Sequence, residues 1–149
     1  MATPILPPDF KEFLRLLSHH KAEYLLVGGY AVGYYGYPRA TADIDIWINK
    51  TYENAVKLIS VLKDFGFNNP QINKDIFLQD NQIIRMGVPP LRIELITTIS
   101  GVEFMECFPE KFTAIIDNVE VNLISLKHLK INKKASGRYK DLDDLEHLP

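Results

Sequence analysis

Apolar residues recur at every third or fourth position in two stretches of the chain, which predicts two amphipathic helices. The first is expected over residues 10–20, with Asp9 before it as a capping residue. The second is expected over residues 52–65, where Thr51 can cap its start and Gly66 can end it. Each helix has an apolar stripe, so both are expected to cover a sheet.

Short apolar runs bounded by turn residues predict the strands. Strands are expected at residues 24–27, 43–49 and 91–97, and hairpins are expected over residues 76–86 and 112–124. Further helices are predicted over residues 30–35, 126–136 (with Ser125 as its cap) and the last few residues of the chain. Because strands and helices alternate, the predicted class is α/β or α+β, with a mixed sheet flanked by helices.

The length of 149 residues favours one domain. We divide it into an N-terminal helix (1–20), a catalytic core (21–124) and basic C-terminal helices (125–149). No apolar run approaches the roughly 18 residues of a membrane span, so no membrane partner is expected. The N-terminus lacks signal-peptide features, and Cys107 is the single cysteine. These observations predict a cytoplasmic protein in which Cys107 is a small buried hydrophobe.

Two aspartates interrupt the apolar run at residues 43–49. Side chains of a strand alternate between its faces, so Asp43 and Asp45 are expected on one face, together with Arg39 and Thr41. Two carboxylates about 6 to 7 Å apart repel each other unless a cation lies between them. Mg²⁺, which proteins hold with one or two carboxylates and substrate phosphates, is the expected cation. The alternative is an edge strand whose charges prevent pairing with another sheet.

A glycine pair, Gly28 and Gly29, follows the predicted strand at residues 24–27. The pair forms either an ordinary tight turn or a site where backbone amides approach an anionic ligand, because glycine has no Cβ. No Gly-Lys-Ser/Thr follows the pair, and the later glycines do not fit the dinucleotide-binding spacing. The two common nucleotide-binding motifs are therefore excluded.

The glycine pair and the acidic pair together resemble the signature of the polymerase-beta-like nucleotidyltransferase superfamily. Thirteen residues separate Gly29 from Asp43, and the acidic pair reads Asp-Ile-Asp-Ile. More narrowly, the chain is similar to small bacterial nucleotidyltransferases related to AbiEii-type toxins. This similarity rests on Gly-Gly-Tyr-Ala, Pro-Arg-Ala-Thr-Ala-Asp-Ile-Asp, Arg-Ile-Glu-Leu-Ile-Thr and Lys-Lys-Ala-Ser-Gly-Arg-Tyr-Lys-Asp-Leu-Asp-Asp-Leu. It covers roughly residues 20 to 148.

The resemblance implies a nucleotidyltransferase fold and a site for two divalent ions, Mg²⁺ or Mn²⁺. The acids of such a site are two from the Asp-x-Asp pair and a third from a neighbouring strand, and Glu94 is the candidate for the third. The superfamily more often has Asp there. An unpaired buried charge is costly, so Glu94 either faces the site or pairs with Arg92 or Arg39. The predicted catalytic and metal-binding residues are Asp43, Asp45 and Glu94.

The basic helix at residues 126–136 carries Lys127, Lys130 and Lys134 on one side. Such a stripe is either a solvated face or a surface that binds phosphates. By the resemblance, basic residues of this C-terminal segment lie near the phosphates of the nucleotide, which selects Lys134 and Arg138. The predicted nucleotide-binding residues are Gly28, Gly29, Arg39, Thr41, Lys134 and Arg138. The acids Asp141, Asp143 and Asp144 are expected to cap the last helix and pair with these bases.

The function predicted from these features is metal-dependent transfer of a nucleoside monophosphate from a nucleoside triphosphate to an acceptor. The acceptor is an RNA 3′ end, a protein or a small molecule, and the toxin resemblance adds an antitoxin protein as a partner. One alternative is an inactive nucleotide-binding or regulatory module of the same fold. Another is a nucleic-acid-binding domain, although a net charge of −2 argues against a surface that binds nucleic acid throughout.

Overall fold

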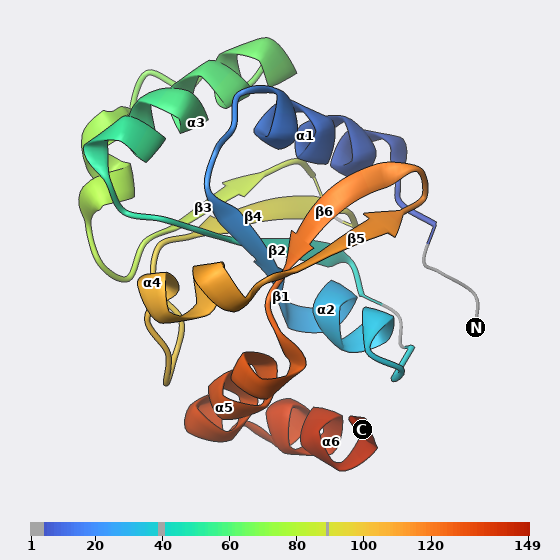
Figure 1. Cartoon of the computed structure of the whole chain (residues 1–149). Helices are drawn as coiled ribbons and strands as arrows, with labels where there is room; N and C mark the ends of the chain where they lie inside the picture. Colours follow the sequence, from blue (N-terminus) through green and yellow to red (C-terminus); the bar gives the residue numbers. More distant parts are fainter. Residues whose placement is uncertain (1–4, 39–40, 89) are drawn as a thin grey trace.

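The computed structural model describes residues 5–38, 41–88 and 90–149, and its centre is a six-stranded sheet (Figure 1). The strands are β1 (Tyr24–Val27), β2 (Asp43–Ile48), β3 (Ile83–Met86), β4 (Arg92–Ile96), β5 (Phe112–Ile116) and β6 (Val119–Leu123). Their order across the sheet is β3-β4-β2-β1-β6-β5. β1 pairs antiparallel with β2 and parallel with β6, and β2 pairs parallel with β4. The predicted mixed sheet is therefore confirmed.

Helices lie on both faces of this sheet. They are α1 (Pro8–His19), α2 (Gly28–Tyr34), α3 (Tyr52–Phe65), α4 (Phe104–Cys107), α5 (Leu126–Ser136) and α6 (Tyr139–His147), with short 3₁₀ helices η1 (Lys74–Leu78) and η2 (Phe108–Glu110). Figure 1 shows α1 and α3 together on one face and α2, α5 and α6 on the other. The sheet is thus the middle of three layers, with apolar side chains on the helices facing it.

The core between the sheet and α1 and α3 is aliphatic and aromatic. Phe13, Leu14 and Leu17 of α1 have no exposed surface, and the same holds for Ile44 and Ile46 of β2. In β2 these buried residues alternate with partly exposed ones, which is the period of two of a strand. The alternation leaves the odd-numbered residues of β2 on the opposite face of the sheet.

The predicted caps at Thr51 and Ser125 are confirmed. Each hydroxyl accepts a hydrogen bond from a backbone amide in the first turn, that of Asn54 for α3 and that of His128 for α5. The predicted cap at Asp9 is wrong, because α1 begins at Pro8, two residues before the expected start, and its N-cap is Pro7. Proline suits the first position of a helix, where its missing N–H is not needed, so Asp9 lies inside the first turn.

The hairpin predicted over residues 76–86 is wrong. Residues Lys74–Leu78 form the 3₁₀ helix η1, in which Phe77 is buried, and the Asn73 side chain caps its start. β3 pairs instead with β4, which follows it. The hairpin predicted over residues 112–124 is confirmed: β5 and β6 are antiparallel, and Asp117 and Asn118 between them both have positive φ. Positive φ at both positions is typical of a tight hairpin turn.

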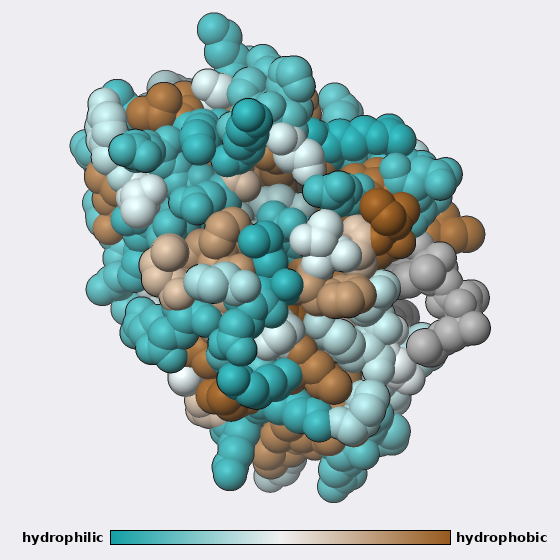
Figure 2. Space-filling view, viewed as in Figure 1, coloured by the Kyte–Doolittle hydropathy of each residue, from teal (hydrophilic) through white to brown (hydrophobic). Residues whose placement is uncertain are grey.

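The outer surface is mainly polar in the view of Figure 1. Figure 2 shows hydrophilic side chains over most of this face, with hydrophobic ones in separate smaller patches. Within the described part of the chain, no helix is long and apolar enough to cross a membrane. Cys107 is fully buried, as predicted for a small hydrophobe.

Candidate nucleotidyl-transfer site

A cavity of about 840 Å³ lies between the sheet and the C-terminal helices. Its strand wall carries the acids Asp43, Asp45 and Glu94 and the bases Arg85 and Arg92. The opposite wall comes from α5 and the start of α6, and a third side comes from the glycine turn after β1. The cavity therefore gathers charged residues from segments that are far apart in the sequence.

Strand register places the acids on adjacent strands. In the parallel pair β2 and β4, Asp45 lies opposite Glu94 and Asp43 lies opposite Arg92. Neighbouring strands are about 4.8 Å apart, so the side chains of Asp45 and Glu94 leave the sheet next to each other. The sequence predicted that Asp43 and Asp45 share a face, and both line this cavity with Glu94.

Two arginines pair with two of these acids. Arg92 donates from Nε to Oδ1 of Asp43 at 3.3 Å and from Nη2 to Oδ2 at 3.4 Å. Arg85 donates from Nε to Oε1 of Glu94 at 3.4 Å. The sequence offered Arg92 or Arg39 as a partner for Glu94. The partner is instead Arg85, because β3 lies beside β4 with Arg85 opposite Glu94; Arg39 is outside the described residues.

Asp45 differs from the other two acids. Among the described residues, it has no hydrogen-bond or ion-pair partner. Burial, together with the nearby carboxylates of Glu94 and Asp43, raises the pKa of its carboxyl to about 6, although Lys140 and Lys133 oppose the shift. Because two other carboxylates lie close to Asp45, a cation would bind favourably beside it.

The glycine turn leaves space for the acids. Gly28 has φ of +68°, and a Cβ built there would lie 2.1 Å from Oδ2 of Asp45. A Cβ on Gly29 would lie 2.9 Å from Oγ1 of Thr41, which itself donates a hydrogen bond to the backbone oxygen of Asp43 at 3.1 Å. The lack of side chains here leaves room for the side chains of Asp45 and Thr41 and keeps bare backbone at the cavity wall.

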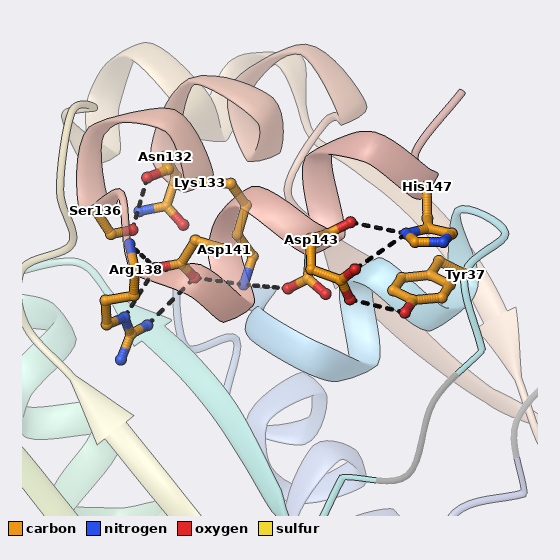
Figure 3. A network of polar contacts seen from close by, with 9 residues as sticks. Tyr37, Asn132, Lys133, Ser136, Arg138, Asp141, Asp143 and His147 are labelled. Carbon is orange, nitrogen blue, oxygen red and sulfur yellow. Dashed lines mark hydrogen bonds and ion pairs between the residues drawn. The ribbon is translucent and has the colours of Figure 1, made fainter.

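The helices α5 and α6 are held together by a buried ionic network, which we call the α5–α6 network (Figure 3). Nζ of Lys133, whose side chain is 4% exposed, lies 3.2 Å from Oδ1 of Asp141 and 3.0 Å from Oδ2 of Asp144. Nε of Arg138 donates to Oδ2 of Asp141 at 2.8 Å. Burial raises the pKa of Asp141, but the hydrogen bonds from Arg138 and Lys133 outweigh it and hold the pKa at about 2.

The network fixes Arg138 at the cavity. The backbone N–H of Arg138 donates to Asp141 at 3.2 Å in a capping box, and the guanidinium is bound by the same carboxylate. The side chain is 69% exposed and lines the cavity with Lys140. Figure 3 shows it extending from the start of α6 toward the strands. Asp141 therefore holds Arg138 through its backbone N–H, Nε and Nη2, while the exposed side chain lines the cavity.

The other end of α6 contacts the loop after α2. Oη of Tyr37 donates to Asp143 at 2.8 Å, and the rings of Tyr37 and His147 stack with centroids 4.0 Å apart (Figure 3). Asp141 and Asp144 pair with basic residues, as the sequence predicted, whereas Asp143 binds a tyrosine and a histidine. These contacts tie the C-terminal helices to the glycine-turn side of the cavity.

The structure brings most of the predicted site residues together. Gly28, Gly29, Thr41 and Arg138 line the cavity with the three acids, and Arg39 is outside the described residues. Lys134 is exposed and is not among the described residues that line the cavity. Its neighbour Lys133 is buried instead, because Leu129, Asn132 and Lys133 form the inward stripe of α5. That stripe was a signal available in the sequence.

The donor chemistry of the strand wall fits a hard cation such as Mg²⁺, which prefers carboxylate oxygens. Within residues 5–38, 41–88 and 90–149, however, no three His, Cys, Asp or Glu side chains form a ready-made metal cluster. Mg²⁺ needs only one or two carboxylates when phosphates and water supply the remaining ligands. The residues therefore fit an ion that binds together with a nucleotide better than an ion held by protein alone.

Comparisons with known proteins support the fold. No protein-family model matches the chain, and no curated protein matches it in sequence. Among solved structures, the chain is similar to the crystal structure of a candidate nucleotidyltransferase from Thermotoga maritima, with a TM-score of 0.64 and 13% identity. The match covers 95% of this chain and 93% of that chain. The chain thus has a nucleotidyltransferase fold, and this likeness does not single out AbiEii-type relatives.

Proposed function

We propose that the protein is a metal-dependent nucleotidyltransferase. It transfers a nucleoside monophosphate from a nucleoside triphosphate to an acceptor hydroxyl and releases pyrophosphate. The observation that carries the proposal is the convergence of Asp43, Asp45 and Glu94, from adjacent strands, on a cavity with bare glycine backbone and basic side chains. The nucleotidyltransferase fold of the chain supports it further.

Asp43, Asp45 and Glu94 would hold Mg²⁺ or Mn²⁺, which would neutralise the triphosphate and lower the pKa of the acceptor hydroxyl. The backbone of Gly28 and Gly29, which lines the cavity, would contact phosphate oxygens. Arg138 and Lys140 would bind the phosphates from the opposite wall. We assign this second contact to Lys140 rather than Lys134, because Lys140 lines the cavity. Arg39 and Thr41 remain proposed nucleotide contacts.

The test is transfer from α-labelled nucleoside triphosphates by purified protein, with total cellular RNA and protein offered as acceptors. Asp45→Asn is expected to reduce labelling at least about a hundredfold, because the site loses its least compensated carboxylate. Asp75→Asn is the matched control, since Asp75 is exposed in η1 and is not among the cavity residues. Labelling by Asp45→Asn at the wild-type rate would contradict the proposal.

A second candidate function is a nucleotide-binding module without turnover. The pairing of Asp43 and Glu94 with arginines favours it, since neither carboxylate is free for a ligand in this arrangement. Calorimetric titration with ATP, with and without Mg²⁺, followed by a pyrophosphate-release assay, separates the two functions. Binding that does not require Mg²⁺ and produces no pyrophosphate would favour the module.

The acceptor and the partner are proposed from the sequence resemblance alone. We propose an RNA 3′ end as the first acceptor to test, with protein and small molecules as the others, and an antitoxin protein as a partner. The labelling experiment identifies the acceptor class by the fraction that gains label. Label in protein rather than RNA would overturn the choice of RNA and leave the transferase proposal intact.

A further inference from the structure

The hairpin of β3 and β4 supplies one arginine to each of two acids in the cavity. We call Arg85 and Arg92 the cavity arginines. Their side chains are 55% and 36% exposed, and they contact carboxylates of Glu94 and Asp43 that are 12% and 28% exposed. All three hydrogen bonds are 3.3 to 3.4 Å long. Charge-assisted hydrogen bonds of this kind are typically about 2.7 to 2.9 Å, so these contacts are loose.

We propose that the cavity arginines exchange partners when the site is loaded. In the free protein they neutralise Asp43 and Glu94; when a divalent cation binds the carboxylates, the guanidinium groups turn to the phosphates of the substrate. This inference rests on the proposed function and extends it to residues that the sequence interpretation gave no part in nucleotide binding. It makes the cavity arginines positioning residues for anionic substrate rather than parts of the scaffold.

The charges on the strand wall support the exchange. Three carboxylates and two guanidinium groups leave one net negative charge on the described strand wall, and that charge is concentrated at Asp45. A divalent cation at this point makes the wall positive. The released guanidinium groups then face the cavity, where a planar guanidinium can bind two phosphate oxygens at once.

The surroundings of the cavity arginines allow this movement. Alternate residues of the two strands, Ile84 and Met86 of β3 and Ile93 and Leu95 of β4, are buried on the other face of the sheet. The hairpin is therefore held by apolar contacts and backbone pairing, and not by the charged side chains. Replacing either arginine should leave the fold intact, since exposed ion pairs contribute about 1 kcal/mol or less.

The experiment measures the affinity of one variant, Arg92→Ala, for two ligands. The affinity for Mn²⁺ without nucleotide, measured by electron paramagnetic resonance, is expected to increase about two- to fivefold, because Arg92 no longer competes with the metal for Asp43. The affinity for tripolyphosphate in the presence of Mg²⁺, measured by calorimetry, is expected to fall about tenfold, because a charged contact with phosphate is lost. A purely structural arginine would not move the two affinities in opposite directions.

Arg15→Ala is the matched control, because it removes the same charge from the exposed side of α1, on the other face of the sheet. It should change neither affinity. If circular dichroism shows that Arg92→Ala does not fold, the same two measurements are made on Arg85→Ala. An affinity for Mn²⁺ that stays constant or falls in the folded variant would overturn the exchange.

Asp45→Asn distinguishes failure of the exchange from failure of the proposed function. If Asp45→Asn abolishes Mn²⁺ binding but Arg92→Ala does not tighten it, the metal site stands and the exchange is wrong. If Asp45→Asn binds Mn²⁺ as the wild type does, the metal site itself is wrong, and the exchange is overturned with it.

Discussion

Two ionic clusters face each other across the cavity, and they are built differently from the same residue types. In the α5–α6 network, Lys133, Asp141 and Asp144 are almost fully buried, and the closest contact of each ion pair is 2.8 to 3.2 Å long. On the strand wall, the closest contacts are 3.3 to 3.4 Å long, the paired carboxylates are 12% and 28% exposed, and Asp45 has no partner among the described residues. A buried, fully paired cluster fixes geometry, whereas an incompletely paired one keeps affinity for a ligand.

The largest effect is expected from breaking the buried cluster. Lys133→Met removes the cation shared by Asp141 and Asp144 and leaves two buried carboxylates without it. The expected loss in the free energy of unfolding is about 3 to 5 kcal/mol, measured by urea denaturation at pH 7.

The control for this substitution is its neighbour. Lys134→Met changes the same charge on the exposed side of α5 and should alter stability by less than about 0.5 kcal/mol. Equal losses of stability in the two variants would mean that Lys133 in the network stabilises the protein no more than an exposed lysine does.

A smaller effect, of opposite sign, is expected from the incomplete cluster. Because the pKa of Asp45 is raised from 3.8 to about 6 in the folded protein, its ionised form destabilises the fold. Wild-type stability should therefore fall as the pH rises from about 4 to 6, relative to Asp45→Asn. At pH 7 the variant should be more stable by about 2 kcal/mol, and below pH 4 the difference should vanish.

Thermal and urea unfolding of the wild type and Asp45→Asn at pH 3.5, 5 and 7 would measure this difference. A stability difference that is constant over this range would show that the Asp45 carboxyl titrates normally. The difference in stability between Asp45→Asn and the wild type would then reflect the packing of the side chain rather than its charge.

The smallest effect is expected at the glycine turn. Gly28→Ala places a Cβ against the Asp45 carboxylate in a backbone conformation with φ of +68°, which costs about 1 to 2 kcal/mol. Gly33→Ala is the matched control: it lies in α2, has open space around its Cβ position and should be stabilising by up to about 1 kcal/mol. Urea denaturation of both variants gives the comparison. A stabilising Gly28→Ala would show that the turn does not require glycine.

Local features of the site were predictable from the sequence. The alternation in β2 placed Asp43 and Asp45 on one face, and the caps at Thr51 and Ser125 set the starts of two helices. These signals operate over a few residues, so they survive without tertiary information. The glycine pair and its spacing to Asp43 predicted the fold through their resemblance to the nucleotidyltransferase signature.

Long-range pairings were not predictable in the same way. Arg85 meets Glu94 only because β3 pairs with β4, and the expected hairpin over residues 76–86 gave β3 a different partner. Which of the adjacent lysines of α5 is buried, Lys133 or Lys134, depends on the face of α5 that α6 covers. The sequence selected Lys134 for phosphate binding and gave Lys133 no role, whereas two acids from α6 make burial of Lys133 favourable.

The parallel pairing of β1 with β6 joins segments from opposite parts of the chain, since Leu26 lies beside Leu123. During synthesis β1 emerges before its partner strand β6 and before the helices α5 and α6 that complete the cavity. Pairings this distant in sequence are slow to form. The acids can therefore be translated and even folded into a partial sheet while Arg138 and Lys140 are still inside the ribosome. A nascent chain therefore has no complete cavity until α5 and α6 have emerged.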